Sequence, residues 1–258
     1  MKYALVGYGR MGRAIEASAA ARGHTLALIV DPAGRGRRFV RGIDQGSWRG
    51  VAVAFEFTEP GSAKDHVLAL LKRGIAVVCG TTGWDATDAA VRRAAKIGGC
   101  GAVIAPNFSV GMNLFYTAVA DAAQRYLAVG GYDPWIVEWH HRAKLDAPSG
   151  TARRLAAIVA AASPRGAVVH EGLTRERIAP ADVHVAAVRA GHQPGRHIVG
   201  FDGPHDAVTI EHAARGREGF AEGAVLAAEW LRGRRGQHGF EEVLRDLVRN
   251  ARRRGGRR

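Results

Sequence analysis

The sequence has few of the features that mark secreted, membrane-spanning or metal-centred proteins. Cys79 and Cys100 are the only cysteines among 258 residues, and neither has a Cys or His partner at metal-ligand spacing. No apolar run is long enough to cross a membrane, and the first residues lack the apolar stretch of a signal peptide. We therefore expect a cytoplasmic protein with reduced thiols, without a bound metal and without a membrane partner.

Positive charge is plentiful but unevenly distributed. The formal net charge is +13, and residues 232–258 account for +7 of it, with ten arginines and three acidic residues. The end of this segment, A-R-R-R-G-G-R-R, has no aromatic residue. We expect a solvated basic tail and no specific nucleic-acid partner. Weak, salt-sensitive binding of polyanions is the alternative.

The first part of the chain alternates between short apolar runs and helical periodicity, which predicts βαβ units and a parallel sheet. The expected strands are residues 3–7, 26–30, 51–57, 75–80 and 102–105, and the expected helices are 11–22, 60–73 and 85–96. After Asn107 the pattern changes to longer helices and a run of strands. Helices are expected at 112–127, 149–162, 220–232 and 240–249, and strands at 135–139, 168–170, 183–189, 196–202 and 207–214. This second pattern predicts a mixed sheet.

A glycine-rich turn follows the first predicted strand. Residues 7–12 read G-Y-G-R-M-G, the G-x-G-x-x-G pattern that brings a pyrophosphate to the N-terminus of a helix. Asp31 ends the next predicted strand, about 20 residues farther on, where a carboxylate binds ribose hydroxyls. The motif therefore predicts a dinucleotide site made of Gly7, Tyr8, Gly9, Arg10, Met11, Gly12 and Asp31.

Turns at later strand ends are expected to border the nicotinamide, because ligands bind beyond the carboxyl ends of parallel strands. These positions are Phe57, Gly80, Thr81, Thr82, Ala105, Pro106, Asn107 and Phe108, and ordinary turns are the alternative. The cofactor is expected to be NADH or NADPH. Asp31 favours NADH because a carboxylate repels a 2′-phosphate, although Arg35, Arg37 and Arg38 could fold back onto one.

The most informative stretch is residues 138–152, E-W-H-H-R-A-K-L-D-A-P-S-G-T-A. Two histidines, an arginine and a lysine lie between His140 and Lys144, and a predicted helix begins at the Ser149 turn. Such a cluster can bind a small dianion and transfer a proton to it. Asp146 is expected to fix the loop by accepting backbone N–H groups. Arg189 and His197 either line the pocket or support the sheet.

Taken together, these segments closely resemble the dihydrodipicolinate reductase family, also called 4-hydroxy-tetrahydrodipicolinate reductases. The resemblance covers about residues 7–231 and rests on G-Y-G-R-M-G-R, F-T-E-P, C-G-T-T-G-W, A-P-N-F-S-V-G-M-N, R-A-G-H-Q-P-G-R-H and, most specifically, H-H-R-A-K-L-D-A-P-S-G-T-A. His192 stands where the family has an acid and Pro194 follows it, so that loop is expected to differ in shape.

The resemblance implies a fold, a reaction and residue roles. The fold is α/β: a Rossmann-type doubly wound parallel sheet with a second α+β domain built on a mixed sheet. Residues 1–108 would bind the dinucleotide, 109–218 the substrate and partner subunits of a homotetramer, and 219–258 would return to the first domain before the basic tail. The substrate is a small cyclic imine dicarboxylate from lysine and diaminopimelate synthesis. Its protons would come from His140 and Lys144, and its binding groups would be His141, Ser149, Gly150 and Thr151.

Two alternatives stay open at this stage. Another nicotinamide enzyme with the same two-domain plan, such as an amino-acid dehydrogenase, would lack the H-H-x-x-K-x-D-A-P-S-G-T string. A polyanion-binding protein that has lost catalysis would depend on its basic tail. Deletion of residues 251–258 separates the two classes, since an enzyme keeps its turnover without them.

Overall fold

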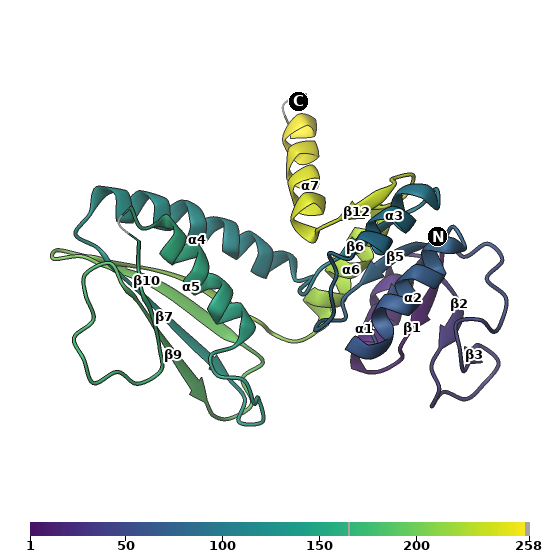
Figure 1. The fold of residues 1–258 in the computed structure, drawn as a ribbon, viewed down its shortest axis with the longest axis horizontal. Helices are drawn as coiled ribbons and strands as arrows, with labels where there is room; N and C mark the ends of the chain where they lie inside the picture. The colour runs from purple at the N-terminus through teal and green to yellow at the C-terminus, as the bar shows by residue number, and fades with distance from the viewer. Residues whose placement is uncertain (165, 256–258) are drawn as a thin grey trace. The chain divides into compact units, whose positions relative to one another are not determined.

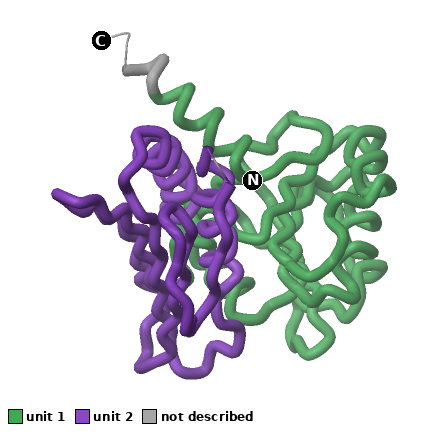
Figure 2. The backbone as a smooth tube through the Cα atoms, turned by 60° about the vertical axis from the view of Figure 1, so that its left-hand side comes forward, with its two compact units in different colours: residues 1–110, 217–258 green, residues 111–216 purple. Residues whose placement is uncertain are grey.

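The computed structural model describes residues 1–164 and 166–255, with side chains described as far as residue 251. The end of the predicted basic tail, residues 256–258, lies outside the described residues. The chain forms two compact units (Figure 2). Unit 1 comprises Met1–Val110 and Arg217–Arg258, and unit 2 comprises Gly111–Gly216.

Unit 1 is built on a seven-stranded parallel sheet with the strand order β12-β6-β5-β4-β1-β2-β3. Its strands are β1 (Lys2–Val6), β2 (Thr25–Val30), β3 (Phe39–Val40), β4 (Val53–Glu56), β5 (Ala76–Cys79), β6 (Gly101–Ile104) and β12 (Gly236–His238). Its helices are α1 (Arg10–Ala21), α2 (Pro60–Lys72), α3 (Ala89–Ile97), α6 (Glu218–Trp230) and α7 (Phe240–Gly255). The predicted Rossmann-type doubly wound sheet is confirmed.

Both faces of this sheet are buried, which explains why its strands are apolar throughout. Tyr3 and Leu5 of β1 point to one face, where α1, α6 and α7 cover them. Ala4 and Val6 point to the other face, where α2 and α3 pack. The period-2 alternation of a strand thus serves two separate cores.

The C-terminal segment completes unit 1 (Figure 1). Helix α6 packs beside α1, and β12 adds a strand at the edge next to β6. The sequence patterns predicted neither β12 nor β3, because such short strands leave little periodicity to read and the residues of β12, Gly-Gln-His, are not apolar. Two helix boundaries also differ: α3 begins only at Ala89, where Asp88 caps it by accepting the Ala90 N–H, and α7 extends to Gly255.

Unit 2 is built on a five-stranded mixed sheet with the order β11-β10-β7-β9-β8. Its strands are β7 (Asp133–His140), β8 (Val169–Glu171), β9 (Val183–Arg189), β10 (Arg196–Asp202) and β11 (Ala207–Ala213), and its helices are α4 (Val110–Val129) and α5 (Gly150–Ala162). Strand β7 pairs parallel with β9 and antiparallel with β10, so the predicted mixed sheet is confirmed. Both helices pack on one face of the sheet, around Ile136, Val185 and Val199 (Figure 1).

Among the described residues, the helices are all too short or too polar to span a lipid bilayer.

Candidate active site

The glycine-rich turn of unit 1 borders a pocket at the carboxyl ends of β1, β2 and β4. Of the predicted cofactor residues, Gly7, Tyr8, Gly9, Asp31 and Phe57 line it. A side chain added at Gly9 would meet no atom within 4 Å, so the backbone there is open to a ligand. One added at Gly7 would lie 2.3 Å from the Phe57 carbonyl oxygen, and Gly7 has a φ of +90°. Open backbone at Gly9 and a tight turn at Gly7 fit a bound pyrophosphate.

Three predicted residues sit on the first turn of α1. Arg10 is exposed, Met11 packs against the core, and Gly12 is buried. A side chain at Gly12 would lie 2.4 Å from the Gly7 carbonyl oxygen, so this glycine is required for the close approach of helix and turn.

Asp31 is held in place by the backbone. One carboxylate oxygen accepts the Tyr8 N–H at 2.8 Å, and the other accepts the Ala33 N–H at 2.9 Å. Each oxygen keeps a lone pair for a ribose hydroxyl. The arginine that lines this pocket is Arg41, whereas Arg35, Arg37 and Arg38 are exposed and are absent from its lining.

The later turns lie around the ends of β4, β5 and β6. The Thr58 N–H donates to the Thr81 hydroxyl at 2.9 Å, which ties the ends of β4 and β5 together. A side chain at Gly80 would lie 2.1 Å from the Phe57 ring. Thr82 and Pro106 are exposed, and Asn107 accepts the Ser109 N–H at 2.8 Å. Ala105 and Phe108 are buried in the core, with the Phe108 ring 5.9 Å from that of Phe57.

A buried carboxylate lies behind the nucleotide pocket. Glu56 is fully buried and accepts hydrogen bonds from the Thr58 hydroxyl and, at 3.1 Å, from the Cys79 thiol. His66, whose ring lines the pocket, lies 3.4 Å from the same carboxylate. Burial would raise the pKa of Glu56, but the hydrogen bonds from His66, Thr58 and the others outweigh it and lower the pKa.

In unit 2, the predicted acid–base residues gather at the end of β7. Glu138 and His140 point to the same face of the strand because they are two residues apart, and both are buried. The His140 Nδ1 is hydrogen-bonded to one oxygen of the Glu138 carboxylate. A side chain added at Gly195 would lie 2.9 Å from the other ring nitrogen, Nε2, so a glycine in the loop before β10 keeps that side of His140 uncrowded.

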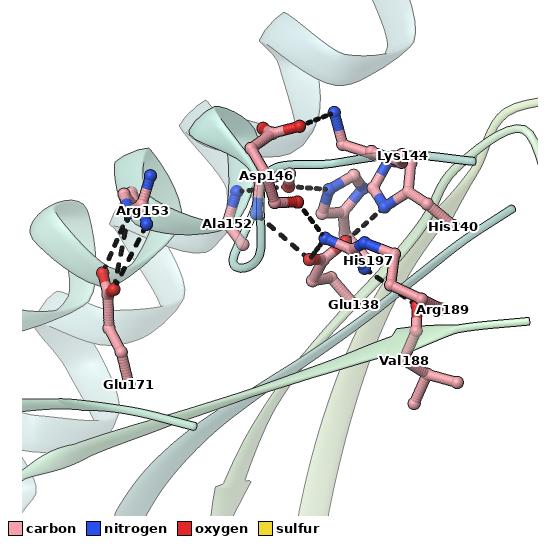
Figure 3. A network of polar contacts seen from close by, with 11 residues as sticks. Glu138, His140, Lys144, Asp146, Ala152, Arg153, Glu171, Val188, Arg189 and His197 are labelled. Carbon is pink, nitrogen blue, oxygen red and sulfur yellow. Dashed lines mark hydrogen bonds and ion pairs between the residues drawn. The ribbon is translucent and has the colours of Figure 1, made fainter. Parts of the chain in front are cut away.

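The second oxygen of Glu138 serves two further elements (Figure 3). It accepts the Ser149 N–H at 3.0 Å and an Arg189 Nη2–H at 2.5 Å. Burial would raise the pKa of Glu138, but the hydrogen bonds from His140, Arg189 and Ser149 outweigh it and lower the pKa to about 2. The carboxylate is therefore ionised at neutral pH.

Helix α5 begins at the predicted anion site. Ser149 caps the helix by accepting the Ala152 N–H at 3.2 Å, and its hydroxyl lies 3.3 Å from His197 Nε2. Burial lowers the pKa of His197 to about 3, so the ring is neutral at neutral pH and shares a hydrogen bond with the serine hydroxyl at Nε2. Gly150 and Thr151 form the first helical turn, where the positive end of the helix dipole favours a carboxylate; the Gly150 N–H already donates to the carboxylate of Asp146.

The loop between β7 and α5 carries the predicted lysine. Lys144 Nζ lies 2.8 Å from Asp146 Oδ1, and the Lys144 side chain is 24% exposed (Figure 3). The contact with Lys144 outweighs the opposing effect of burial and holds the pKa of Asp146 below its usual range. The His141 N–H donates to the Gln193 carbonyl at 2.8 Å, which joins this loop to the one before β10. Arg142 is exposed.

Glu138, His140 and His197 also offer ligand atoms that lie within 4.8 Å of one another, the spacing of a metal site. Arg189, however, already binds the same carboxylate at 2.5 Å, and a guanidinium cation repels a metal ion. The donor set therefore suits proton transfer better than metal binding.

The sequence patterns did not single out Glu138, and they left Arg189 between lining the pocket and supporting the sheet. The spacing of Glu138 two residues before His140 was a usable signal, because alternate residues of a strand share one face. No spacing could reveal the Arg189 contact, since this residue is 51 positions away in the chain. Arg189 and His197 are compatible with both earlier interpretations, because each contacts a site residue and each belongs to a strand of the sheet.

Unit 1 has a doubly wound sheet with a G-x-G-x-x-G turn, and unit 2 holds a histidine–carboxylate pair beside a helix N-terminus. This combination defines a nicotinamide-dependent oxidoreductase. Two family models match: dihydrodipicolinate reductase N-terminus over residues 1–108, and dihydrodipicolinate reductase C-terminus over residues 111–244. The chain belongs to the dihydrodipicolinate reductase family.

Curated relatives agree along most of the chain. The 4-hydroxy-tetrahydrodipicolinate reductase of Chromobacterium violaceum is 40% identical, over 92% of this chain and 95% of that protein. The reductase of Laribacter hongkongensis is 41% identical, over 92% of this chain and 94% of that protein. Among solved structures, dipicolinate-bound dihydrodipicolinate reductase from Paenisporosarcina sp. TG-14 has the same fold, with a TM-score of 0.76, 22% identity, and coverage of 94% of this chain and 98% of that one.

Proposed function

We propose that this chain catalyses the NAD(P)H-dependent reduction of 4-hydroxy-tetrahydrodipicolinate to tetrahydrodipicolinate, in the cytoplasm, for lysine and diaminopimelate synthesis. Unit 1 binds the nucleotide and unit 2 binds the substrate. One observation carries the proposal: the Glu138–His140 pair lies beside the N-terminus of α5, in a chain of this family. This arrangement joins a proton donor to a carboxylate-binding site.

The substrate carries two carboxylates, and unit 2 offers donors for them. The first turn of α5 presents the Ser149 hydroxyl and the backbone of Gly150 and Thr151, and the positive end of the helix dipole favours an anion there. His141 and Lys144 add donors from the preceding loop. Lys144 is paired with Asp146, so the incoming carboxylate competes with Asp146 for the lysine.

A bound nicotinamide supplies the hydride. The chain's own task is then to protonate the reduced ring and to assist loss of the substrate hydroxyl as water. Lys144 Nζ, a partly exposed ammonium group of the loop, acts as a proton donor. His140, with Nδ1 bonded to Glu138, gives and takes its proton at Nε2.

Replacement of the lysine tests this assignment. We expect Lys144→Ala to lower kcat about 10²–10⁴-fold, the usual loss for a positioned acid. Turnover is measured by nicotinamide absorbance with freshly generated cyclic imine. Arg142→Ala is the matched control, because Arg142 is an exposed cation of the same loop and should have near-normal turnover. Near-normal turnover of Lys144→Ala would remove the lysine from the mechanism.

We propose that NADH is preferred and NADPH is also accepted. Asp31 accepts ribose hydroxyls and repels a 2′-phosphate, while Arg41 lines the same pocket and can offset that repulsion. Arg41→Ala should therefore reduce kcat/KM with NADPH much more than with NADH. Equal losses with both cofactors, or a wild-type enzyme that strongly prefers NADPH, would contradict this assignment.

The open face of the unit 2 sheet supports a homotetramer. Helices α4 and α5 cover one face, and Trp139 and Val188, which pair across β7 and β9, lie on the other at 39% and 41% exposure. A second copy of this chain would bury such a face. Trp139→Glu should lower the molecular mass measured by sedimentation, while Leu173→Glu, at a fully exposed loop position of the same unit, should leave it unchanged.

A further inference from the structure

Glu138 connects three separate parts of unit 2 through one buried side chain. Its Oε2 binds His140 on the same strand, and its Oε1 binds both the Ser149 N–H at 3.0 Å and Arg189 Nη2 at 2.5 Å (Figure 3). The carboxylate is fully buried, so water does not compete for these contacts.

We propose that Glu138 is a positioning residue that confines proton exchange of His140 to Nε2 and couples that ring to the carboxylate-binding end of α5. This inference rests on the proposed acid–base role of His140. Glu138 itself touches neither substrate nor cofactor; it acts through His140 and Ser149.

The confinement follows from what a carboxylate can do in a hydrogen bond. An ionised carboxylate only accepts, so the His140 Nδ1 that faces it must carry a hydrogen in both charge states of the ring. The nitrogen that gains and loses a proton is then Nε2, next to Gly195. A histidine without this partner could adopt either tautomer, so some of its neutral molecules would present the wrong nitrogen.

The charge of Glu138 also matters, because the other groups around His140 are basic. Arg189 comes from β9, His197 from β10 and Lys144 from the loop after β7, with the two imidazole rings 5.2 Å apart. Arg189 and Lys144 are cations, and Glu138 is the buried anion among them. Asp146, the other carboxylate of the site, is 49% exposed and paired with Lys144.

The coupling to the helix runs through Ser149. Glu138 holds the Ser149 backbone N–H, while His197 lies at its hydroxyl and Ser149 in turn caps α5. A shift of the carboxylate therefore moves the ring of His140 and the first turn of α5 together. The Glu138 side chain therefore sets the distance between the proton donor His140 and a substrate bound at α5.

Glu138→Gln tests the proposal with minimal change of shape. The amide oxygen can keep the bonds to Ser149 and Arg189, but the amide NH₂ in place of Oε2 donates, so it forces the Nδ1 of neutral His140 to become an acceptor. We expect the neutral tautomer to switch to Nε2–H in nitrogen NMR of labelled histidine. We also expect kcat to fall about 10²-fold or more, as for a catalytic histidine in the wrong tautomer, with a much smaller change in KM.

Controls keep the test decisive. Glu171→Gln removes a carboxylate from an exposed pair with Arg153 in the same unit, and should change neither the tautomer nor kcat. Glu138→Asp keeps an acceptor and should keep the Nδ1–H tautomer with part of the activity. The wild-type enzyme gives an answer even where Glu138→Gln does not fold: a neutral His140 with its hydrogen on Nε2 would overturn the proposal.

The same experiments separate this inference from the function on which it rests. If His140→Asn retained full turnover, the proposed acid–base role of His140 would be wrong, whatever its tautomer. If His140→Asn were inactive but Glu138→Gln kept the wild-type tautomer and kcat, the positioning role would be wrong and the function would stand.

Discussion

Two buried glutamates, one in each unit, have the same exposure but different partners. Glu56 at the end of β4 is bound by the hydroxyl of Thr58 and the thiol of Cys79, with His66 at 3.4 Å. Glu138 near the end of β7 is bound by a guanidinium and a backbone N–H, besides its histidine. Both carboxyl groups have lowered pKa values, so both are ionised.

The difference shows how the same residue type, a buried glutamate, can support the fold in one unit and the proposed chemistry in the other. Mostly neutral donors around Glu56 tie β4, β5 and α2 together behind the nucleotide pocket without adding a fixed charge. At Glu138, Arg189 forms a buried ion pair with one carboxylate oxygen, and the other oxygen is hydrogen-bonded to the His140 ring. Burying charge is costly unless it is paired, so the second arrangement depends more strongly on each partner.

The largest effect is expected from removing the fixed cation. Arg189→Met leaves the Glu138 charge buried without its counterion, and we expect the free energy of unfolding to fall by about 3–5 kcal/mol. His66→Gln, at the partly exposed partner of Glu56, should cost about 1 kcal/mol. Urea unfolding at neutral pH measures both. Equal losses of unfolding free energy in the two variants would contradict the proposed difference between the ion-paired Glu138 and the mostly neutral surroundings of Glu56.

A pH-dependent effect is expected from His197, which is buried beside Glu138. Its pKa is lowered to about 3 from 6.5. Below pH 6.5 the unfolded chain binds a proton that the folded chain does not, so stability declines as the pH falls from 6.5 towards 3. The slope is about 1.4 kcal/mol per pH unit. His197→Gln should flatten this part of the stability curve.

The control for that experiment is His205→Gln, an exposed histidine in the same unit, which should leave the curve unchanged. Glu138 contributes in the same direction at lower pH: its stabilisation is present above pH 4.5 and is lost as the pH falls towards about 2. A curve for His197→Gln as steep as that of the wild type would mean that His197 is charged in the folded protein.

The smallest effect is expected at single donors. Cys79→Ala removes one hydrogen bond from Glu56, and Ser149→Ala removes the cap of α5; each should cost about 1 kcal/mol. Only Ser149→Ala should also raise the KM for the substrate. Thermal unfolding and steady-state kinetics check the pair. A raised substrate KM for Cys79→Ala would contradict the separation of structural and functional carboxylates.

Much of the fold could be predicted, because long periodic segments carry their own signal. Strands β9 and β10 lie at the predicted residues, and Ser149 caps α5 where the Ser-Gly-Thr turn suggested a helix start. The misses have one physical cause. Strands β3 and β12 have two and three residues, and β12 exists only because β6, far away in sequence, offers it a free edge.

For the site, the residue types and their clustering were readable, since anion binding and proton transfer need particular groups within a short loop. His140, Lys144 and the Ser149 turn are neighbours in the chain as well as in space. The sequence by itself therefore determined the fold class, the family and the loop for which we propose acid–base chemistry. Only the tertiary structure decided which partners Glu138 has. The Arg189 guanidinium reaches Glu138 because β7 pairs with β9, and strand pairing depends on long-range packing that no local pattern encodes.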